Sequence, residues 1–104
     1  MTPRRIADLS VYPVGLGAMP LSDTAMLAER PRALATVHAA LDSGITLVDT
    51  ADIYAPDGER FGHNEILGGE AVRSWAGSSA DRERIVVATK GGITRSVGPD
   101  GDVW

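Results

Sequence analysis

The chain has 104 residues, of which 43% are hydrophobic and 23% are charged, with a formal net charge of −4 and no cysteine. This composition is typical of one folded domain and excludes a disordered or fibrous chain. The absence of cysteine excludes a disulfide framework and a thiolate metal site. The acidic net charge disfavours nucleic acid or an anionic membrane as a partner, because both require a basic surface.

Membrane and metal signals are also missing from the sequence. Residues 1–10 include two arginines but lead into no apolar segment of the signal-peptide type, and no run approaches the roughly 18 apolar residues that span a bilayer. The carboxylates and histidines show no spacing typical of metal ligands. We therefore expect a cytoplasmic protein without a metal site.

The first expected elements lie in residues 6–19, "IADLSVYPVGLGAM", which could form a hairpin and then a strand. Gly15 and Gly17, one residue apart, would let the backbone approach a ligand closely. They do not complete a G-x-G-x-x-G dinucleotide motif, because Pro20 occupies the position of the third glycine. A tight turn after the strand is the alternative interpretation.

A first helix and strand are expected next. Pro31 suits the first turn of a helix, and Gly44 stands where a left-handed C-terminal cap is expected. Apolar residues recur on one face of this helix: Leu34, Val37 and Leu41. The segment 45–50, "ITLVDT", then has the composition of a strand.

A second helix is expected to begin with Asn64 as its N-cap and to reach about Ala76. Its expected apolar contacts are Ile66, Leu67, Ala71 and Trp75. Gly68 and Gly69 each cost on the order of 1 kcal/mol of helix stability relative to alanine. A close approach of the helix to a sheet would explain why glycine is tolerated there.

A polar turn over residues 77–84, "GSSADRER", leads to the apolar strand 85–89, "IVVAT". Strands that alternate with helices predict right-handed βαβ crossovers and a parallel sheet covered on both faces. The fold class is therefore α/β. Residues 91–104, "GGITRSVGPDGDVW", are expected to form a loop.

Two charged residues follow the two predicted parallel strands. Asp49 lies at the end of the first, and Lys90, the single lysine in a chain with nine arginines, ends the second. The carboxyl ends of parallel strands form one edge of a sheet, where ligands bind, so we expect the two side chains to meet. The alternatives are that Asp49 or Asp52 caps a turn, or that the pair is a structural salt bridge.

Tyr54 lies five residues after Asp49, far enough to leave the strand and turn back over its end. Beside a lysine cation the phenolate form is favoured, so the phenol can donate a proton to a developing alkoxide near neutral pH. A packing role is the alternative for this tyrosine. His38 and His63 are expected to be packing or surface residues and are assigned no role.

The motifs "GLGAM", "DTADIY", "HNEILG" and "IVVATKGG", in this order and at these separations, resemble the N-terminal part of an aldo-keto reductase. The resemblance implies a single incomplete domain over 1–104, about three βα units of a (β/α)8 TIM barrel. It also implies NADP(H) as cofactor, usually NADPH, and an aldehyde or ketone as the small-molecule substrate.

The resemblance also implies roles for individual residues. Tyr54 would be the general acid that protonates the carbonyl oxygen, Lys90 would make it more acidic, and Asp49 would pair with the lysine and contact the nicotinamide ribose. The cofactor-binding residues implied in this way are Gly17, Ala18, Met19 and Asp49. The "NEILG" motif matches the acidic residue and the glycine that the family usually has on its second helix, and the resemblance implies a structural role for both.

The sequence departs from the family in its extent. The family's catalytic histidine ends a further strand that this sequence does not include, and neither His38 nor His63 matches it. A barrel needs about 250 residues, and three isolated strands would leave unpaired edges. We therefore expect marginal stability or self-association, and a fragment that does not turn over alone.

Two other readings stay open. The chain could be a non-catalytic cofactor-binding or interaction module derived from the same fold, or an incomplete product without a function. The substrate cannot be read from these residues, because loops at the barrel mouth select it in the family. Trp104 could form part of one such loop or of a plain surface loop.

Overall fold

The computed structural model describes residues 2–98 and 101–103 of the chain. It begins with an antiparallel hairpin of β1 (Arg4–Ile6) and β2 (Leu9–Val11), in which Arg4 pairs with Val11. The expected strand follows as β3 (Leu16–Gly17). The predicted hairpin and strand at the N-terminus are therefore confirmed.

Three parallel strands form the sheet, in the order β3, β4 (Leu47–Asp49) and β5 (Val86–Ala88). Helix α1 (Arg30–Asp42) connects the first two, and α2 (His63–Ser74) lies in the second crossover. Short 3₁₀ helices lie in the connections: η1 (Met19–Ser22), η2 (Thr24–Met26) and η3 (Gly58–Arg60). The predicted α/β class with a parallel sheet is confirmed.

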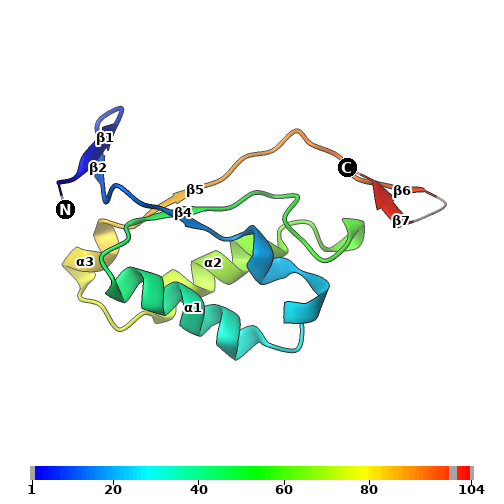
Figure 1. Ribbon diagram of the computed structural model, residues 1–104, viewed down its shortest axis with the longest axis horizontal. Coiled ribbons are helices and arrows are strands. Elements are labelled where there is room, and N and C mark those ends of the chain that lie inside the picture. The colour runs from blue at the N-terminus through cyan, green and yellow to red at the C-terminus, as the bar shows by residue number, and fades with distance from the viewer. Residues whose placement is uncertain (1, 99–100, 104) are drawn as a thin grey trace.

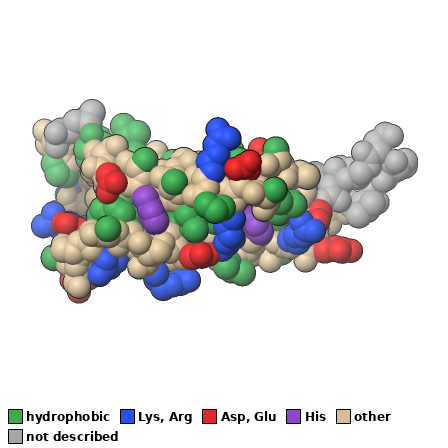
Figure 2. Space-filling model, turned by 90° about the horizontal axis from the view of Figure 1, so that it is seen from below, with side chains coloured by type: hydrophobic (Ala, Val, Ile, Leu, Met, Phe, Trp, Pro, Cys, Tyr) green, Lys and Arg blue, Asp and Glu red, His purple; other side chains and the backbone are tan. Residues whose placement is uncertain are grey.

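The molecule has two layers, because α1 and α2 lie side by side against one face of the sheet (Figure 1). Among the described residues no helix covers the other face, so the expected cover on both faces is wrong. Acidic and basic side chains are intermixed over the helix-bearing face (Figure 2). The core lies between the sheet and the two helices. It consists of Ala18, Val37, Leu41, Val48 and Ala71, with Leu34 packed against it.

Helix α1 begins and ends as its sequence predicts. Pro31 lies in the first turn, and Gly44 adopts a left-handed conformation with φ 102° after the last turn. The Gly44 N–H donates to the Leu41 carbonyl at 3.1 Å and the Ile45 N–H to the Ala40 carbonyl at 3.2 Å. These two bonds form a Schellman motif, which satisfies carbonyls that have no partner within the helix.

Helix α2 differs from its prediction at three positions. Gly62, with φ 89°, precedes its first residue, and Asn64 lies inside the helix as a fully buried residue and caps nothing. Ile66 is 64% exposed, whereas Leu67 faces the core. A Cβ added at Gly68 would meet no atom of another element within 4 Å, so close approach to the sheet does not explain that glycine.

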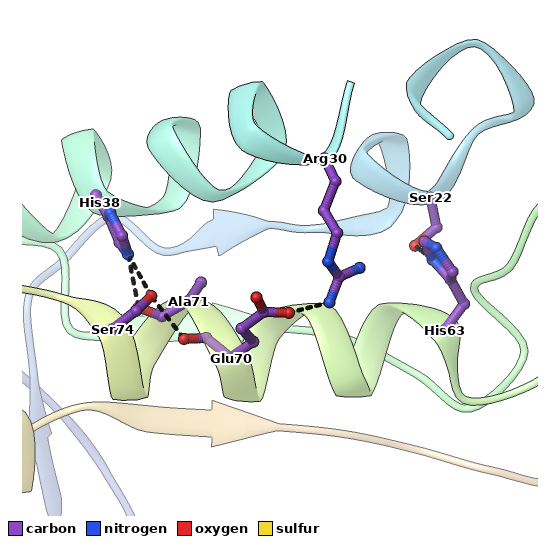
Figure 3. A network of polar contacts seen from close by, with 7 residues as sticks. All are labelled: Ser22, Arg30, His38, His63, Glu70, Ala71 and Ser74. Carbon is purple, nitrogen blue, oxygen red and sulfur yellow. Dashed lines mark hydrogen bonds and ion pairs between the residues drawn. The ribbon is translucent and has the colours of Figure 1, made fainter. Parts of the chain in front are cut away.

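Polar contacts join the two helices along their line of contact (Figure 3). His38 Nε2 lies 2.8 Å from the Ala71 carbonyl oxygen and 3.1 Å from Ser74 Oγ, and Arg30 forms an ion pair with Glu70. A carbonyl oxygen only accepts hydrogen bonds, so the His38 nitrogen is the donor. His38 therefore links α1 to α2, a contact between helices that fits the expectation of a packing residue.

The sequence did not predict one short helix and one hairpin. The segment 77–84, expected as a turn, contains the helix α3 (Ser79–Glu83), and the Ser78 side chain accepts a hydrogen bond from the Asp81 N–H at 3.1 Å as its N-cap. The segment expected as a terminal loop contains the antiparallel hairpin of β6 (Ser96–Gly98) and β7 (Gly101–Val103). The prediction for Trp104 lies outside the described residues.

The hairpins β1–β2 and β6–β7 lie at opposite ends of the molecule (Figure 1). Within the described ranges, no helix is long and apolar enough to cross a bilayer. The same residues include no group of three or more histidine, aspartate or glutamate side chains that could hold a metal ion.

Candidate functional site

The carboxyl ends of β4 and β5 lie next to each other in register, with Asp49 opposite Ala88. The pairing continues past the strands, because the Thr50 N–H donates to the Ala88 carbonyl at 2.8 Å and the Asp52 N–H to the Lys90 carbonyl at 3.1 Å. This continuation holds Lys90 beside the segment that follows Asp49. Backbone pairing therefore determines which side chains meet at this edge.

Three predicted site residues converge here. Lys90 Nζ lies 3.0 Å from Asp49 Oδ1 and 4.7 Å from the centroid of the Tyr54 ring. The ammonium also donates to the Thr50 carbonyl at 2.8 Å. The lysine and aspartate side chains are 45% and 53% exposed, so the group is open to a ligand from the uncovered face.

The electrostatics of this group favour a charged lysine. Hydrogen bonding to the Tyr54 side chain, and then to the Asp49 carboxylate, raises the pKa of Lys90 above its ordinary value, and desolvation opposes the shift only in part. The side chain is therefore an ammonium at neutral pH. A cation fixed beside a phenol stabilises negative charge at that position, which is what a proton-donating tyrosine requires.

The backbone around Tyr54 is fixed on both sides of the residue. The Tyr54 N–H donates to the Ala51 carbonyl at 3.3 Å, and the Tyr54 carbonyl accepts from the Asn64 N–H at 3.1 Å. Arg95 Nη1 donates to the carbonyl of the next residue, Ala55, at 2.8 Å. Tyr54 is half-buried, so the loop holds the tyrosine against the sheet edge instead of leaving it in solvent.

The segment after β3 supplies the third side of the edge. Gly17 pairs with Asp49, and the Ala18 N–H donates to the Asp49 carbonyl at 2.9 Å. Gly17 and Met19 are exposed, the latter to 46%, whereas Ala18 is 2% exposed and its side chain lies in the core. A Cβ added at Gly17 would meet no atom within 4 Å, so the space above this glycine is open.

Sequence reasoning missed a buried polar group directly beneath this edge. This group consists of Ser22, Thr50 and Asn64, each at most 2% exposed. The Asn64 side chain forms hydrogen bonds with both of the others. A helical spacing could have revealed the asparagine, because the buried residues of α2 are Asn64, Leu67, Gly68 and Ala71. These positions follow the i, i+3, i+4, i+7 pattern of a core-facing helix side.

The model of the aldo/keto reductase family matches residues 13–102. The chain belongs to the aldo/keto reductase family. Its fold is accordingly the N-terminal part of a TIM barrel, in which the carboxyl ends of the strands carry the active site. Among the residues that the structure describes, the edge formed by Asp49, Tyr54 and Lys90 corresponds to that end of an aldo/keto reductase barrel.

Two curated relatives match most of this chain. The 6-dehydroglucose reductase of Novosphingobium aromaticivorans is 44% identical over 88 residues, which cover 84% of this chain and 27% of the relative. The uncharacterized oxidoreductase YqkF of Bacillus subtilis is 35% identical over 98 residues, or 94% of this chain and 27% of the relative. The chain spans about a quarter of the length of these relatives.

A solved structure shows the same extent of similarity. The aldo-keto reductase AKR11C1 from Bacillus halodurans, in its holo form, is 31% identical and superposes with a TM-score of 0.69. The match covers 100% of this chain and 30% of that protein. The whole described fold of this aldo/keto reductase chain therefore occurs in a longer relative.

Proposed function

We propose that this chain supplies the catalytic edge of an NADPH-dependent reductase that converts an aldehyde or ketone to an alcohol. The observation that carries the proposal is the meeting of Asp49 and Tyr54 around Lys90, which is the single lysine of the sequence. The family membership and the reductase names of the relatives support this reaction class. Cytoplasmic residence belongs to the same proposal.

The open edge fits a nicotinamide cofactor. The Asp49 carboxylate, 53% exposed, offers an acceptor for a ribose hydroxyl, and the space above Gly17 admits a flat ring against the backbone. Met19 adds an exposed apolar surface beside it, whereas Ala18 contributes only backbone because its side chain is buried. When bound, NADPH supplies the hydride.

The proton is the part of the reaction that these residues perform. The Tyr54 hydroxyl holds the substrate carbonyl oxygen by a hydrogen bond and gives up its proton as that oxygen becomes an alkoxide. The Lys90 ammonium stabilises the phenolate that remains. Asp49 holds the ammonium in place at 3.0 Å, so each of the three groups has a distinct task.

The test uses a hybrid enzyme in which residues 13–102 replace the matching part of the Novosphingobium reductase, so that the rest of a barrel is present. We expect carbonyl reduction with NADPH by the hybrid. Tyr54→Phe should lower kcat by about two to four orders of magnitude, which is the usual contribution of general acid catalysis. The dissociation constant for NADPH, from fluorescence titration, should stay unchanged because the phenol donates only to the substrate.

Unchanged turnover after Tyr54→Phe would defeat the role proposed for the tyrosine. A second candidate function is a cofactor-binding module without catalysis. Two features also favour it: the uncovered face of the sheet, and the outer edges of β3 and β5, which are unpaired within the described sheet. Tight NADPH binding by a hybrid that does not reduce carbonyls would select this candidate. For the 104-residue chain by itself we propose no turnover and self-association through these edges, measured by sedimentation.

A further inference from the structure

Asn64 is a polar residue with no exposure to solvent, and both polar atoms of its side chain form hydrogen bonds. Its Nδ2 lies 2.8 Å from the Ala18 carbonyl oxygen and 2.8 Å from Ser22 Oγ. Its Oδ1 accepts from Thr50 Oγ1 at 2.6 Å. Both protons of the amide nitrogen and one lone pair of the oxygen are therefore used inside the protein.

The direction of these bonds follows from the chemistry of the partners. A carbonyl oxygen cannot donate, so the amide nitrogen must face Ala18 and the amide oxygen must face Thr50. Ser22 then accepts from Asn64 and has its own proton left for His63 Nδ1, which lies 2.7 Å from Ser22 Oγ (Figure 3). The chain of hydrogen bonds runs in one sense, from Thr50 to His63.

The groups held by Asn64 belong to the three segments of the candidate site. Ala18 lies between Gly17 and Met19. Thr50 directly follows Asp49, and its carbonyl oxygen accepts a hydrogen bond from Lys90. The backbone N–H of Asn64 also donates to the Tyr54 carbonyl at 3.1 Å. One buried residue on α2 thus bonds to the cofactor-binding segment, to the end of β4 and to the tyrosine loop.

Stability alone does not account for a polar residue at this position. Burying an amide brings a desolvation cost that its hydrogen bonds only offset, whereas its apolar neighbour Leu67 on the same face gains free energy from burial. A fully satisfied polar network instead selects one arrangement of the segments it joins. The geometry of Asn64 is therefore that of a residue that fixes relative positions.

We infer that Asn64 is a positioning residue that sets the separation between the nicotinamide-binding segment and the proton-donating edge. This inference rests on the proposed reductase function. The amide nitrogen acts on the Ala18 side and the amide oxygen on the Thr50 side. The two sides can therefore be loosened one at a time by different substitutions.

The first test is site-resolved hydrogen exchange on the full 104-residue chain. Asn64→Asp keeps the acceptor for Thr50 but places a carboxylate oxygen against the Ala18 carbonyl. We expect the amides of Ala18 and Leu21 to exchange about tenfold faster relative to the reference amide of Val86, because one buried hydrogen bond restrains this segment. Thr50→Val, which conserves shape, should instead accelerate exchange at Asp52.

Ser74→Ala is the matched control, since it also removes a polar side chain from α2. Among the described residues the Ser74 hydroxyl bonds to Glu70, Ala71 and His38, none of which belongs to the candidate site. Ser74→Ala should leave exchange at Ala18 unchanged. Equal acceleration of all amides by Asn64→Asp, or none at Ala18 and Leu21, would overturn the inference. If Asn64→Asp does not fold, Thr50→Val is the test: faster exchange at Asp52 supports the inference, and unchanged exchange there overturns it.

The second test separates positioning from general structure in the hybrid enzyme. Asn64→Asp should raise KM for NADPH about tenfold with little change in kcat, and Thr50→Val should lower kcat with little change in KM, because each acts on one side of the site. Equal effects of both variants on both constants would contradict the inference. An inactive parent hybrid would contradict the proposed function. The hydrogen-exchange result would then still test whether Asn64 positions the two segments.

Discussion

The two faces of the three-stranded sheet differ in what their side chains do. Val48, in the middle of β4, points towards the helices and is fully buried, whereas the next residue, Asp49, points to the uncovered face and is 53% exposed. Successive side chains of a strand point to opposite faces. One strand therefore contributes alternately to the core and to the candidate site, and the two tasks can be changed separately.

The largest expected effect is on the uncovered face. Lys90→Met in the hybrid enzyme should lower carbonyl reduction by about two orders of magnitude or more, because the phenolate left by proton transfer loses its cation. The free energy of unfolding should change little, since exposed ion pairs contribute little to stability. Steady-state rates and urea denaturation give the two values. Turnover equal to that of the parent hybrid would contradict the role of the lysine.

A smaller effect is expected on the helix-bearing face. Val48→Ala should lower the free energy of unfolding by about 2 kcal/mol, through lost apolar burial and the cavity that remains. Val87 is its register partner on β5 but is 42% exposed, so Val87→Ala is a matched control. Val87→Ala should lower the free energy of unfolding by about half as much as Val48→Ala, or less. The two valines lie side by side on the same face of the sheet, so equal losses in urea denaturation would show that Val48 is not packed beneath the helices as described.

The smallest effect concerns pH and lies in the helix layer. Burial, and then the charges of Arg30 and Arg60, lower the pKa of His63 from its ordinary value of 6.5. The folded chain therefore binds fewer protons than the unfolded chain, so stability falls as pH decreases below about 6.5 and levels off below the folded pKa. His63→Gln should flatten this dependence, measured from urea midpoints between about pH 7 and pH 5.

The opposite sign is expected for the uncovered face. The pKa of Lys90 is raised above its ordinary value of 10.5. Its contribution to the free energy of unfolding is therefore complete below that value and is lost as pH rises through the folded pKa. Lys90→Met should therefore leave the acid side of the stability profile unchanged and alter only the alkaline side.

The prediction for His63 has its own contradicting outcome. If the acid slope of the stability profile is the same in the parent chain and in His63→Gln, that slope does not come from His63.

The sequence predicted the features that depend on local chemistry or simple periodicity. Gly44 ends α1 because glycine adopts the left-handed conformation without a steric penalty. The meeting of Asp49 and Lys90 followed from two strand ends and the rule that parallel strands align. These inferences needed no knowledge of which side chains pack together.

The features that were missed depend on tertiary partners. Asn64 was expected as an N-cap because asparagine is common there, but three groups from other segments hold it inside the core. Ile66 and Leu67 were both expected as apolar contacts, yet the helix is oriented so that only Leu67 of the two is buried. A short helix such as Ser79–Glu83 is too brief for periodicity to reveal.

The register between β4 and β5 makes the chain unequally tolerant of insertions. Asp49 and Lys90 are 41 positions apart in sequence and meet only because Asp49 lies opposite Ala88. Extra residues in the polar connection before β5 would lengthen a surface loop and leave that alignment intact. A single extra residue within Val86–Ala88 would turn every later side chain of the strand to the other face, and the lysine would then point at the helices instead of at the tyrosine.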